Sequence, residues 1–278
     1  MYRPRNRILL AAGIIGSLLA FVFATPAQGA TTPPPSSMAA LGDSITRGFD
    51  ACGLFSDCPS ASFATGTTAS VRSHYSRILA VNTAMSGHAN NDAKTGAKAS
   101  DLNRQAQTAV GQSAQYVTIL IGANDACTST EAGMTAVATF RSQIDAAMAT
   151  LKAGLPSARI LVISIPDLKR LWDIGKGSSS ARTLWALGGT CKSMLANPTS
   201  TAAADAARRD RVRQRVIDFN TQLAQACAAY GGNCAYDNNA VFNYPFVLSQ
   251  ISTWDYFHPN LTGQSVLASV TYAAGFGW

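Results

Sequence analysis

The stretch MAALGDSITRGFDACG, residues 38–53, begins as an apolar strand and stops abruptly at Gly42, Asp43 and Ser44. Glycine and aspartate are common turn residues, and Ser44 could simply cap a helix. The same layout can instead place a serine hydroxyl at the end of a strand, where it can act as a nucleophile. The remaining sequence has to decide between a structural and a chemical role for Ser44.

Short apolar segments alternate with helical patterns along the chain. Apolar runs at 38–41, 78–85, 116–122 and 159–165 predict four strands, and a short fifth is expected within 233–242. The third and fourth runs are apolar on both faces, which is typical of parallel strands that helices cover on both sides. We therefore expect a three-layer α/β/α sandwich with a mainly parallel five-stranded sheet.

Two segments have the periodicity of buried helices. The first stripe consists of Val137, Phe140, Ile144, Met148 and Leu151. Thr128 and Glu131, which precede that stripe, match the capping-box pattern of a helix start. A second helix is expected over 205–230, with a stripe of Val212, Val216, Phe219, Leu223 and Tyr230. The glycine pair at 231–232 should end this second helix.

The first 29 residues have the layout of a secretory signal peptide. Three arginines precede the apolar segment ILLAAGIIGSLLAFVFA (8–24), and small residues follow it, with cleavage expected between Ala27 and Ala30. An uncleaved membrane anchor is the alternative, because 17 apolar residues are at the short end of a spanning helix. Residues 30–37, which include three prolines, predict a linker. The folded domain should then cover 38–278 of a secreted, extracellular protein.

The charge of the chain argues against a nucleic-acid partner. Charged residues make up only 13% of the sequence, and the formal net charge is +7. Loss of Arg3, Arg5 and Arg7 with the signal peptide would lower this charge to +4. Lysine and arginine form no long runs, so we expect no nucleic-acid binding and only a weak attraction to anionic lipid surfaces.

The cysteine content favours disulfides over a metal site. The six cysteines are Cys52, Cys58, Cys127, Cys191, Cys227 and Cys234. An even number behind an export signal is typical of disulfides. Proximity in sequence favours the pairs 52–58 and 227–234, which leaves 127–191 as the third. Zinc is the competing interpretation, but the chain has no C-x-x-C motif and its three histidines lack ligand spacing. We expect no metal and no cofactor.

Two further motifs are expected to lie near Ser44. The strand at 116–122 ends in Gly-Ala-Asn-Asp, which brings Asn124 to the same carboxyl edge of the sheet as Ser44. The Asn124 amide can donate to an oxyanion, although asparagine is also a common turn residue. In TWDYFHPNLTGQS (253–265), Asp255 lies three residues before His258. A carboxylate there can bind Nδ1 of the imidazole and leave Nε2 to accept a serine proton, unless His258 is an ordinary surface histidine.

Gly87, in NTAMSGHANND (82–92), is a fourth candidate, because a loop glycine can present its backbone N–H after the second expected strand. The four blocks are Gly42-Asp43-Ser44, Gly87, Gly122-Ala123-Asn124-Asp125 and Asp255-Tyr256-Phe257-His258. In this order they resemble the SGNH hydrolases, also called the GDSL esterase/lipase family. The resemblance covers residues 38–270. The segments GDSITRGFDACG, VTILIGANDAC and IPDLKRLW are also similar to the secreted bacterial phospholipase A/B-type branch.

The resemblance implies a role for each of these residues. Ser44 would be the nucleophile, and His258 would act as general base and then general acid, oriented by Asp255. Some family members use a main-chain carbonyl in place of this aspartate, so that alternative stays open. The N–H groups of Ser44 and Gly87 and the side chain of Asn124 would form the oxyanion hole. The sequence lacks the G-x-S-x-G elbow of ordinary α/β-hydrolases and the common metalloprotease and nucleotide motifs.

Apolar residues on the expected catalytic loops indicate a lipid substrate. The candidate substrate-binding residues are Phe49, Leu171, Trp172, Trp254 and Phe257. We expect a monomer that cleaves acyl esters of lipids and transiently contacts membrane or micelle surfaces. The same residues could instead pack the loops onto the domain. Two alternative functions are a carbohydrate O-acetyl esterase on the same scaffold and a non-catalytic lipid-binding module.

Overall fold

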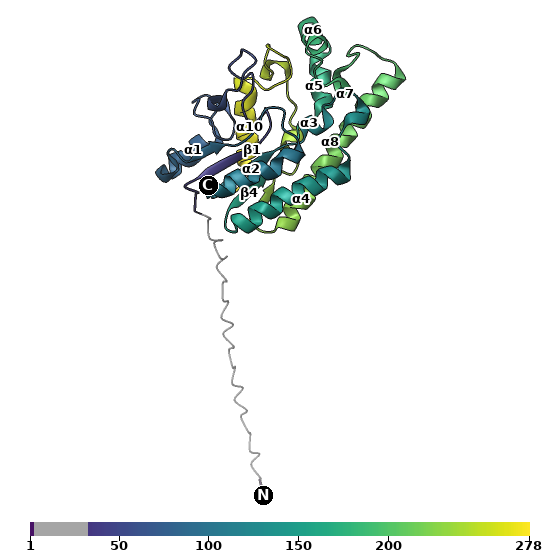
Figure 1. Cartoon of the computed structure of the whole chain (residues 1–278). Helices are drawn as coiled ribbons and strands as arrows, with labels where there is room; N and C mark the ends of the chain where they lie inside the picture. The colour runs from purple at the N-terminus through teal and green to yellow at the C-terminus, as the bar shows by residue number, and fades with distance from the viewer. Residues whose placement is uncertain (3–32) are drawn as a thin grey trace. The chain divides into compact units, whose positions relative to one another are not determined.

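The computed structural model describes residues 1–2 and 33–278, and a five-stranded sheet lies at the centre of residues 33–278 (Figure 1). Its strand order is β2-β1-β3-β4-β5, and every neighbouring pair is parallel. The strands are β1 Met38–Gly42, β2 Ala89–Asn91, β3 Tyr116–Leu120, β4 Arg159–Val162 and β5 Cys234–Tyr236. β1 and β3 are buried along their whole length, as two-sided apolar runs predict.

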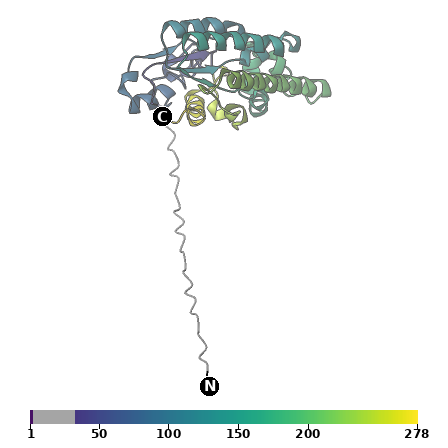
Figure 2. The same cartoon turned by 90° about the horizontal axis from the view of Figure 1, so that it is seen from below.

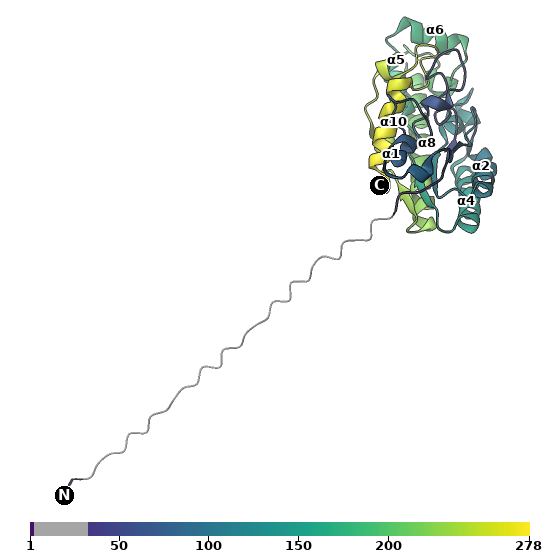
Figure 3. The ribbon, with the colours of Figure 1, turned by 90° about the vertical axis from the view of Figure 1, so that its left-hand side faces the viewer.

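Helices cover both faces of this sheet, which confirms the predicted three-layer α/β/α architecture (Figures 2 and 3). The helices are α1 His74–Val81, α2 Ala99–Gly111, α3 Ala123–Ala126, α4 Val137–Gly154, α5 Leu168–Gly175, α6 Ser179–Leu187, α7 Lys192–Leu195, α8 Ala203–Tyr230, α9 Ala240–Asn243 and α10 Leu261–Ala273. α2 packs against α4 and α4 against α8 in one layer, whereas α1 and α10 lie in the other. Four short 3-10 turns lie at Pro59–Ala61, Thr83–Met85, Glu131–Gly133 and Leu248–Gln250.

The two helices with predicted apolar stripes form and pack together. Phe140 of α4 stacks on Phe219 of α8 with ring centroids 4.1 Å apart, and both side chains are fully buried. α8 ends at Tyr230, and the next residue, Gly231, has a φ of 101° that suits glycine. The Cys227–Cys234 disulfide then joins the last turn of α8 to β5. The other two disulfides are Cys52–Cys58 and Cys127–Cys191, the same pairs that proximity in sequence favours.

The second strand lies later in the chain than predicted, so the strand expected within 78–85 is wrong. Ser73 caps α1 by accepting a hydrogen bond from the Ser76 N–H, and residues 74–81 are helical. The real β2 has the polar sequence Ala-Asn-Asn, which carries no apolar signal. Its strand conformation comes from pairing with β1, where Met38 pairs with Ala89.

The capping box predicted at Thr128 and Glu131 is also wrong. The Thr128 hydroxyl donates to the carbonyl of Thr130 instead of capping a helix, and α4 begins only at residue 137. The Glu131 carboxylate accepts a hydrogen bond from the Arg211 guanidinium of α8 at 2.8 Å. Glu131 therefore forms an ion pair with Arg211 of α8 instead of capping the start of a helix.

Residues 33–37, which fall in the predicted linker, are attached to the domain. The Asn82 amide donates to the carbonyls of Pro34 and Pro35, and the Ser36 N–H donates to the Gln115 side chain. The rest of the linker and nearly all of the predicted signal peptide lie outside the described residues. Among the described helices, none combines the length and apolar character needed to cross a bilayer.

Candidate active site

Gly42 ends β1 in a conformation that only glycine tolerates, and this turn positions Ser44. Its φ is 148°, and a β-carbon there would lie 2.3 Å from the Leu120 carbonyl oxygen. The Gln105 side chain accepts from the Gly42 N–H at 2.7 Å and donates to the Gly42 carbonyl at 2.9 Å. These contacts fix the end of β1, so that Ser44 follows at the carboxyl edge of the sheet.

Asp43, the middle residue of the motif, stabilises the turn from inside. Its carboxylate is buried and accepts a hydrogen bond from the Ile45 N–H at 2.9 Å. Burial raises the pKa of Asp43 to about 7, because the charged form loses its hydration. The side chain faces the protein interior, whereas the Ser44 hydroxyl meets His258.

Ser44, His258 and Asp255 form a continuous hydrogen-bonded chain. The Ser44 Oγ lies 2.8 Å from His258 Nε2, and His258 Nδ1 lies 2.5 Å from an Asp255 carboxylate oxygen. The other Asp255 oxygen accepts from the backbone N–H groups of Phe257 and His258 at 2.8 and 3.1 Å. Burial alone would raise the pKa of Asp255, but the hydrogen bonds and charge of His258 outweigh it and hold that pKa below its ordinary value. A side-chain carboxylate rather than a main-chain carbonyl therefore contacts Nδ1.

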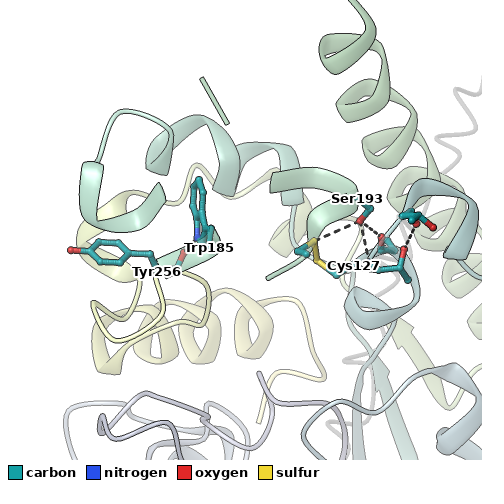
Figure 4. The surroundings of a disulfide bond; sticks show 8 residues. Cys127, Trp185, Ser193 and Tyr256 are labelled. Carbon is teal, nitrogen blue, oxygen red and sulfur yellow. Dashed lines mark hydrogen bonds between the residues drawn. A yellow bond between two sulfur atoms is a disulfide. The ribbon is translucent and has the colours of Figure 1, made fainter. Parts of the chain in front are cut away.

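The loop that carries His258 is held at both ends. The Ser252 N–H donates to the His258 carbonyl at 2.8 Å, and the Asn260 side chain caps α10 by accepting from Gly263. The Trp185 Nε1–H of α6 donates to the Tyr256 carbonyl at 2.9 Å (Figure 4). Trp185 was not among the sequence candidates, because its contact with this loop joins positions 71 residues apart.

Asn124 lies in the first turn of α3, directly after β3. Gly122 makes the turn with a φ of 117°, and a β-carbon there would lie 2.6 Å from the Ile165 side chain. The Asn124 amide donates one hydrogen bond to the Ala97 carbonyl at 3.0 Å, which leaves its second N–H for another acceptor. The Cys127–Cys191 disulfide and Ser193 of α7 brace the segment that follows α3 (Figure 4).

Gly87 is the one oxyanion candidate that the structure places at the wrong end of the sheet. The Met38 N–H at the start of β1 donates to the His88 carbonyl, so Gly87 lies at the amino edge, opposite Ser44. Gly96 follows β2 at the carboxyl edge, next to the Ala97 carbonyl that Asn124 contacts. Its φ is 81°, and a β-carbon would meet open space. The sequence prediction missed Gly96 because it placed the second strand too early in the chain. A glycine at the carboxyl edge must follow the strand, and Gly96 follows β2.

An oxyanion hole next to Ser44 requires N–H groups that have no hydrogen-bond acceptor within the protein. Across residues 33–278, neither the Gly96 N–H nor the Ser44 N–H makes a hydrogen bond. The two unpartnered N–H groups and the second Asn124 N–H belong to segments that follow three neighbouring strands: Gly96 follows β2, Ser44 follows β1, and Asn124 in α3 follows β3. This arrangement can stabilise negative charge on an oxygen next to Ser44.

An apolar cleft opens beside Ser44 and His258. Its apolar lining includes Ile45, Leu168, Leu171, Phe246, Ile251 and Phe257. Two of the predicted substrate-binding residues, Leu171 and Phe257, therefore line the cleft. Phe49 packs on the His258 ring instead, with centroids 4.8 Å apart. The cleft therefore presents an apolar surface next to the Ser44 hydroxyl and the His258 ring.

Trp172 and Trp254, two of the predicted substrate-binding residues, do not line this cleft. The Trp172 ring is contacted by Lys176 at 4.2 Å and by Arg209 at 4.3 Å, and its N–H donates to Pro198. Cation–π contacts thus occupy the side chain. Trp254 is 44% exposed and contacts the Phe55 ring outside the cleft.

A cluster of potential metal ligands overlaps the hydrogen-bonded chain. Within the described part of the molecule it is the one group of three such side chains, and it consists of Asp50, Asp255 and His258. One carboxylate oxygen of each aspartate and one ring nitrogen of His258 lie within 4.8 Å of one another. His258 and Asp255 of this cluster are hydrogen-bonded to each other. That the protein needs no metal ion stays a prediction.

Comparisons with known proteins agree with the fold and the motif order. Residues 38–270 match the family model described as GDSL-like Lipase/Acylhydrolase. This match places the protein in the class of carboxylic ester hydrolases that carry the Gly-Asp-Ser motif. The chain belongs to the GDSL-like lipase/acylhydrolase family. A comparison with curated protein sequences finds no match.

Solved structures from several bacteria share the fold. A GDSL-like lipase from Parabacteroides merdae has a TM-score of 0.55 and 16% identity, over 88% of this chain and 97% of its own. An extracellular lipase from Streptomyces rimosus has a TM-score of 0.51 and 22% identity, over 86% and 99%. An acetyl-xylooligosaccharide esterase from Geobacillus has a TM-score of 0.52 and 16% identity, over 87% and 94%. At such identities these likenesses show the fold alone.

Proposed function

We propose that this protein is a secreted serine esterase that cleaves acyl esters of lipids, with Ser44, His258 and Asp255 as its catalytic triad. The observation that carries the proposal is the pair of hydrogen bonds, 2.8 and 2.5 Å long, that joins these side chains beside an apolar cleft. Asp255 fixes the proton on Nδ1, so Nε2 is free to accept the Ser44 proton.

The reaction follows from this geometry. The Ser44 oxygen attacks the ester carbonyl carbon while its proton moves to His258 Nε2, and the carbonyl oxygen becomes an oxyanion. The N–H groups of Ser44, Gly96 and Asn124 stabilise that oxyanion. His258 then donates its proton to the leaving alcohol, which leaves an acyl-serine. Water attacks the acyl-serine with His258 as base, releases the fatty acid and restores Ser44.

The lining of the cleft supports medium or long acyl chains over acetate. Each methylene of an acyl chain buried there can contribute ~0.8 kcal/mol of binding. We therefore expect kcat/KM for p-nitrophenyl esters to rise with chain length until the cleft is filled, and fatty acid to be released from phospholipid micelles. A profile that peaks at acetate, with no release from phospholipid, would contradict this proposal and favour a carbohydrate O-acetyl esterase.

The Cys52–Cys58 loop supports contact with a lipid surface. Leu54 and Phe55 are 73% and 59% exposed, and Trp254 from the loop of His258 packs against the Phe55 ring. Leu54 and Phe55 have φ values of 72° and 48°, so a short disulfide-closed loop holds two apolar side chains outward in the left-handed region. Exposed aromatic and aliphatic residues beside an acyl cleft suit the interface of a micelle or bilayer.

Vesicle binding tests this loop. In a Ser44→Ala background that prevents hydrolysis, Leu54→Ser with Phe55→Ser should reduce co-sedimentation with anionic phosphatidylglycerol vesicles at least about fivefold, because buried apolar area is lost. Val81→Ser is the matched control, since Val81 is 59% exposed at the end of α1, before β2. Equal binding by both variants would remove the loop from the proposal.

Secretion is part of the proposal and rests on two observations. The described domain has three disulfides and no free cysteine, which is typical of proteins that fold in an oxidising compartment. The N-terminal sequence has the layout of a signal peptide over residues 1–29. A monomeric state remains an expectation.

A further inference from the structure

Asp50 is a buried carboxylate with no assigned role in the proposed reaction. It is 1% exposed, and within residues 33–278 neither of its carboxylate oxygens has a hydrogen-bond partner. Buried carboxylates are normally hydrogen-bonded or paired with a cation, because an unpaired charge is costly in the interior. Its position therefore needs an explanation.

The Asp50 side chain lies next to Asp255 and His258 of the proposed triad. One Asp50 oxygen, one Asp255 oxygen and a His258 ring nitrogen lie within 4.8 Å of one another. The Asp50 backbone is anchored to the same loop, since its carbonyl accepts from the Ser252 hydroxyl at 3.0 Å. Its φ is 57°, a left-handed conformation that aspartate and asparagine tolerate better than most residues.

Asp50 and Asp255 differ in their hydrogen bonds. Asp255 accepts from two backbone N–H groups and from His258, whereas Asp50 accepts none of these. When the pair holds one proton, that proton should therefore reside on Asp50. Burial first, and then the neighbouring charge of Asp255, raises the pKa of Asp50 to about 6. Above that pH two carboxylates face one imidazole.

The charged groups around this cluster are few. Asp255 and His258, both on the loop before α10, act on Asp50 directly. Asp43 approaches His258 from the end of β1. On the loop of Asp50 itself, Arg47 and Asp57 pair with each other at 2.9 Å. His258 is therefore the cation that a charged Asp50 can stabilise.

We infer that Asp50 is a positioning residue that acts through Asp255 and His258, where its negative charge stabilises the imidazolium formed when Ser44 attacks. This inference rests on the proposed triad and deepens it. The imidazolium appears only during the reaction, so a nearby charge lowers the barrier rather than the energy of bound substrate. Because Asp50 carries this charge only when it is ionised, loss of the carboxylate should also change the acid limb of the pH profile.

The test compares Asp50→Asn with the native protein on soluble p-nitrophenyl butanoate. Asparagine suits the left-handed backbone and removes only the charge, and thermal unfolding checks that the variant folds. We expect kcat to fall about 3- to 10-fold and the acid limb to move about 0.5–1 pH unit lower, since one unit equals a tenfold change in proton affinity. Asp145→Asn, on the outer face of α4 with a half-exposed carboxylate, is the charge-matched control and should leave both unchanged.

A second measurement does not depend on turnover. The proton shared by His258 and Asp255 should give a downfield NMR signal, whose frequency changes with a step near pH 6 that Asp50→Asn abolishes. An unchanged pH profile together with an unchanged NMR titration would overturn the role of Asp50. Full activity of Ser44→Ala would instead overturn the proposed triad, so the two failures are distinguishable.

Discussion

At the scale of single residues, three backbone turns determine which groups face the reacting oxygen. Gly42, Gly96 and Gly122 all have positive φ and follow adjacent strands β1, β2 and β3. Gly42 and Gly122 leave no room for a β-carbon, whereas Gly96 has open space beside it. Gly42 and Gly122 therefore allow their turns to pack closely against neighbouring residues, whereas Gly96 leaves its N–H accessible.

Asn124 provides the residue-scale prediction. Asn124→Ala should lower kcat by about 10²–10³-fold with little change in KM, because its free amide N–H acts only when the oxyanion forms. Gly87→Asn is the control, since asparagine tolerates the φ of 77° and the residue lies at the amino edge of the sheet. A tenfold or larger loss of kcat in Gly87→Asn would mean that Gly87, not Gly96, completes the oxyanion hole.

At the scale of elements, His74 connects three of them inside the layer opposite α2 and α4. Its Nδ1 lies 2.8 Å from the Tyr116 hydroxyl of β3, and its Nε2 lies 2.7 Å from the Thr271 hydroxyl of α10. The Thr271 hydroxyl already donates to the Leu267 carbonyl, so Nε2 must carry the proton. Both ring nitrogens are thus satisfied in the neutral form, and burial lowers the pKa of His74 to about 3.

Acid should destabilise the fold through His74. The unfolded chain binds a proton at this site below about pH 6.5, whereas the folded protein does so only near pH 3. The free energy of unfolding should therefore decrease as pH falls through that window, by up to about 4–5 kcal/mol from this group. His74→Gln should be less stable at pH 7 but lose this part of the pH dependence.

Urea unfolding at pH 7, 6, 5 and 4 measures the effect as the difference between the two proteins, which removes the contribution of the buried carboxyls. An equal pH slope for native protein and His74→Gln would refute the assignment to His74.

At the scale of the whole molecule, the sheet was largely predictable and its weakest strand was not. The apolar runs of β1, β3 and β4 predict buried parallel strands, and the structure confirms them. β2 has only three residues, two of them asparagine, so its conformation depends on pairing with β1 rather than on its own sequence. Because of that displacement the sequence prediction chose Gly87, whereas the glycine that follows β2 at the carboxyl edge of the sheet is Gly96.

The candidate site was predictable where short motifs carry it. Ser44, Asn124 and the Asp255–His258 pair are visible in sequence, because each lies in a recognisable turn or loop motif. Asp50 and Trp185 are not, because their contacts with the His258 loop depend on how distant segments pack. The apolar cleft beside Ser44 was only partly predictable for the same reason: Leu171 lines it, whereas cations stack on the neighbouring Trp172.

The central claim is that His258 activates Ser44 as the single nucleophile of this molecule. A fluorophosphonate reacts with serines activated in this way, and mass spectrometry of the labelled protein locates the modified residue. We predict one label per chain, on Ser44, with labelling slowed at least about 10³-fold in His258→Ala. Label on any other residue, or equally rapid labelling of Ser44 in His258→Ala, would contradict the claim.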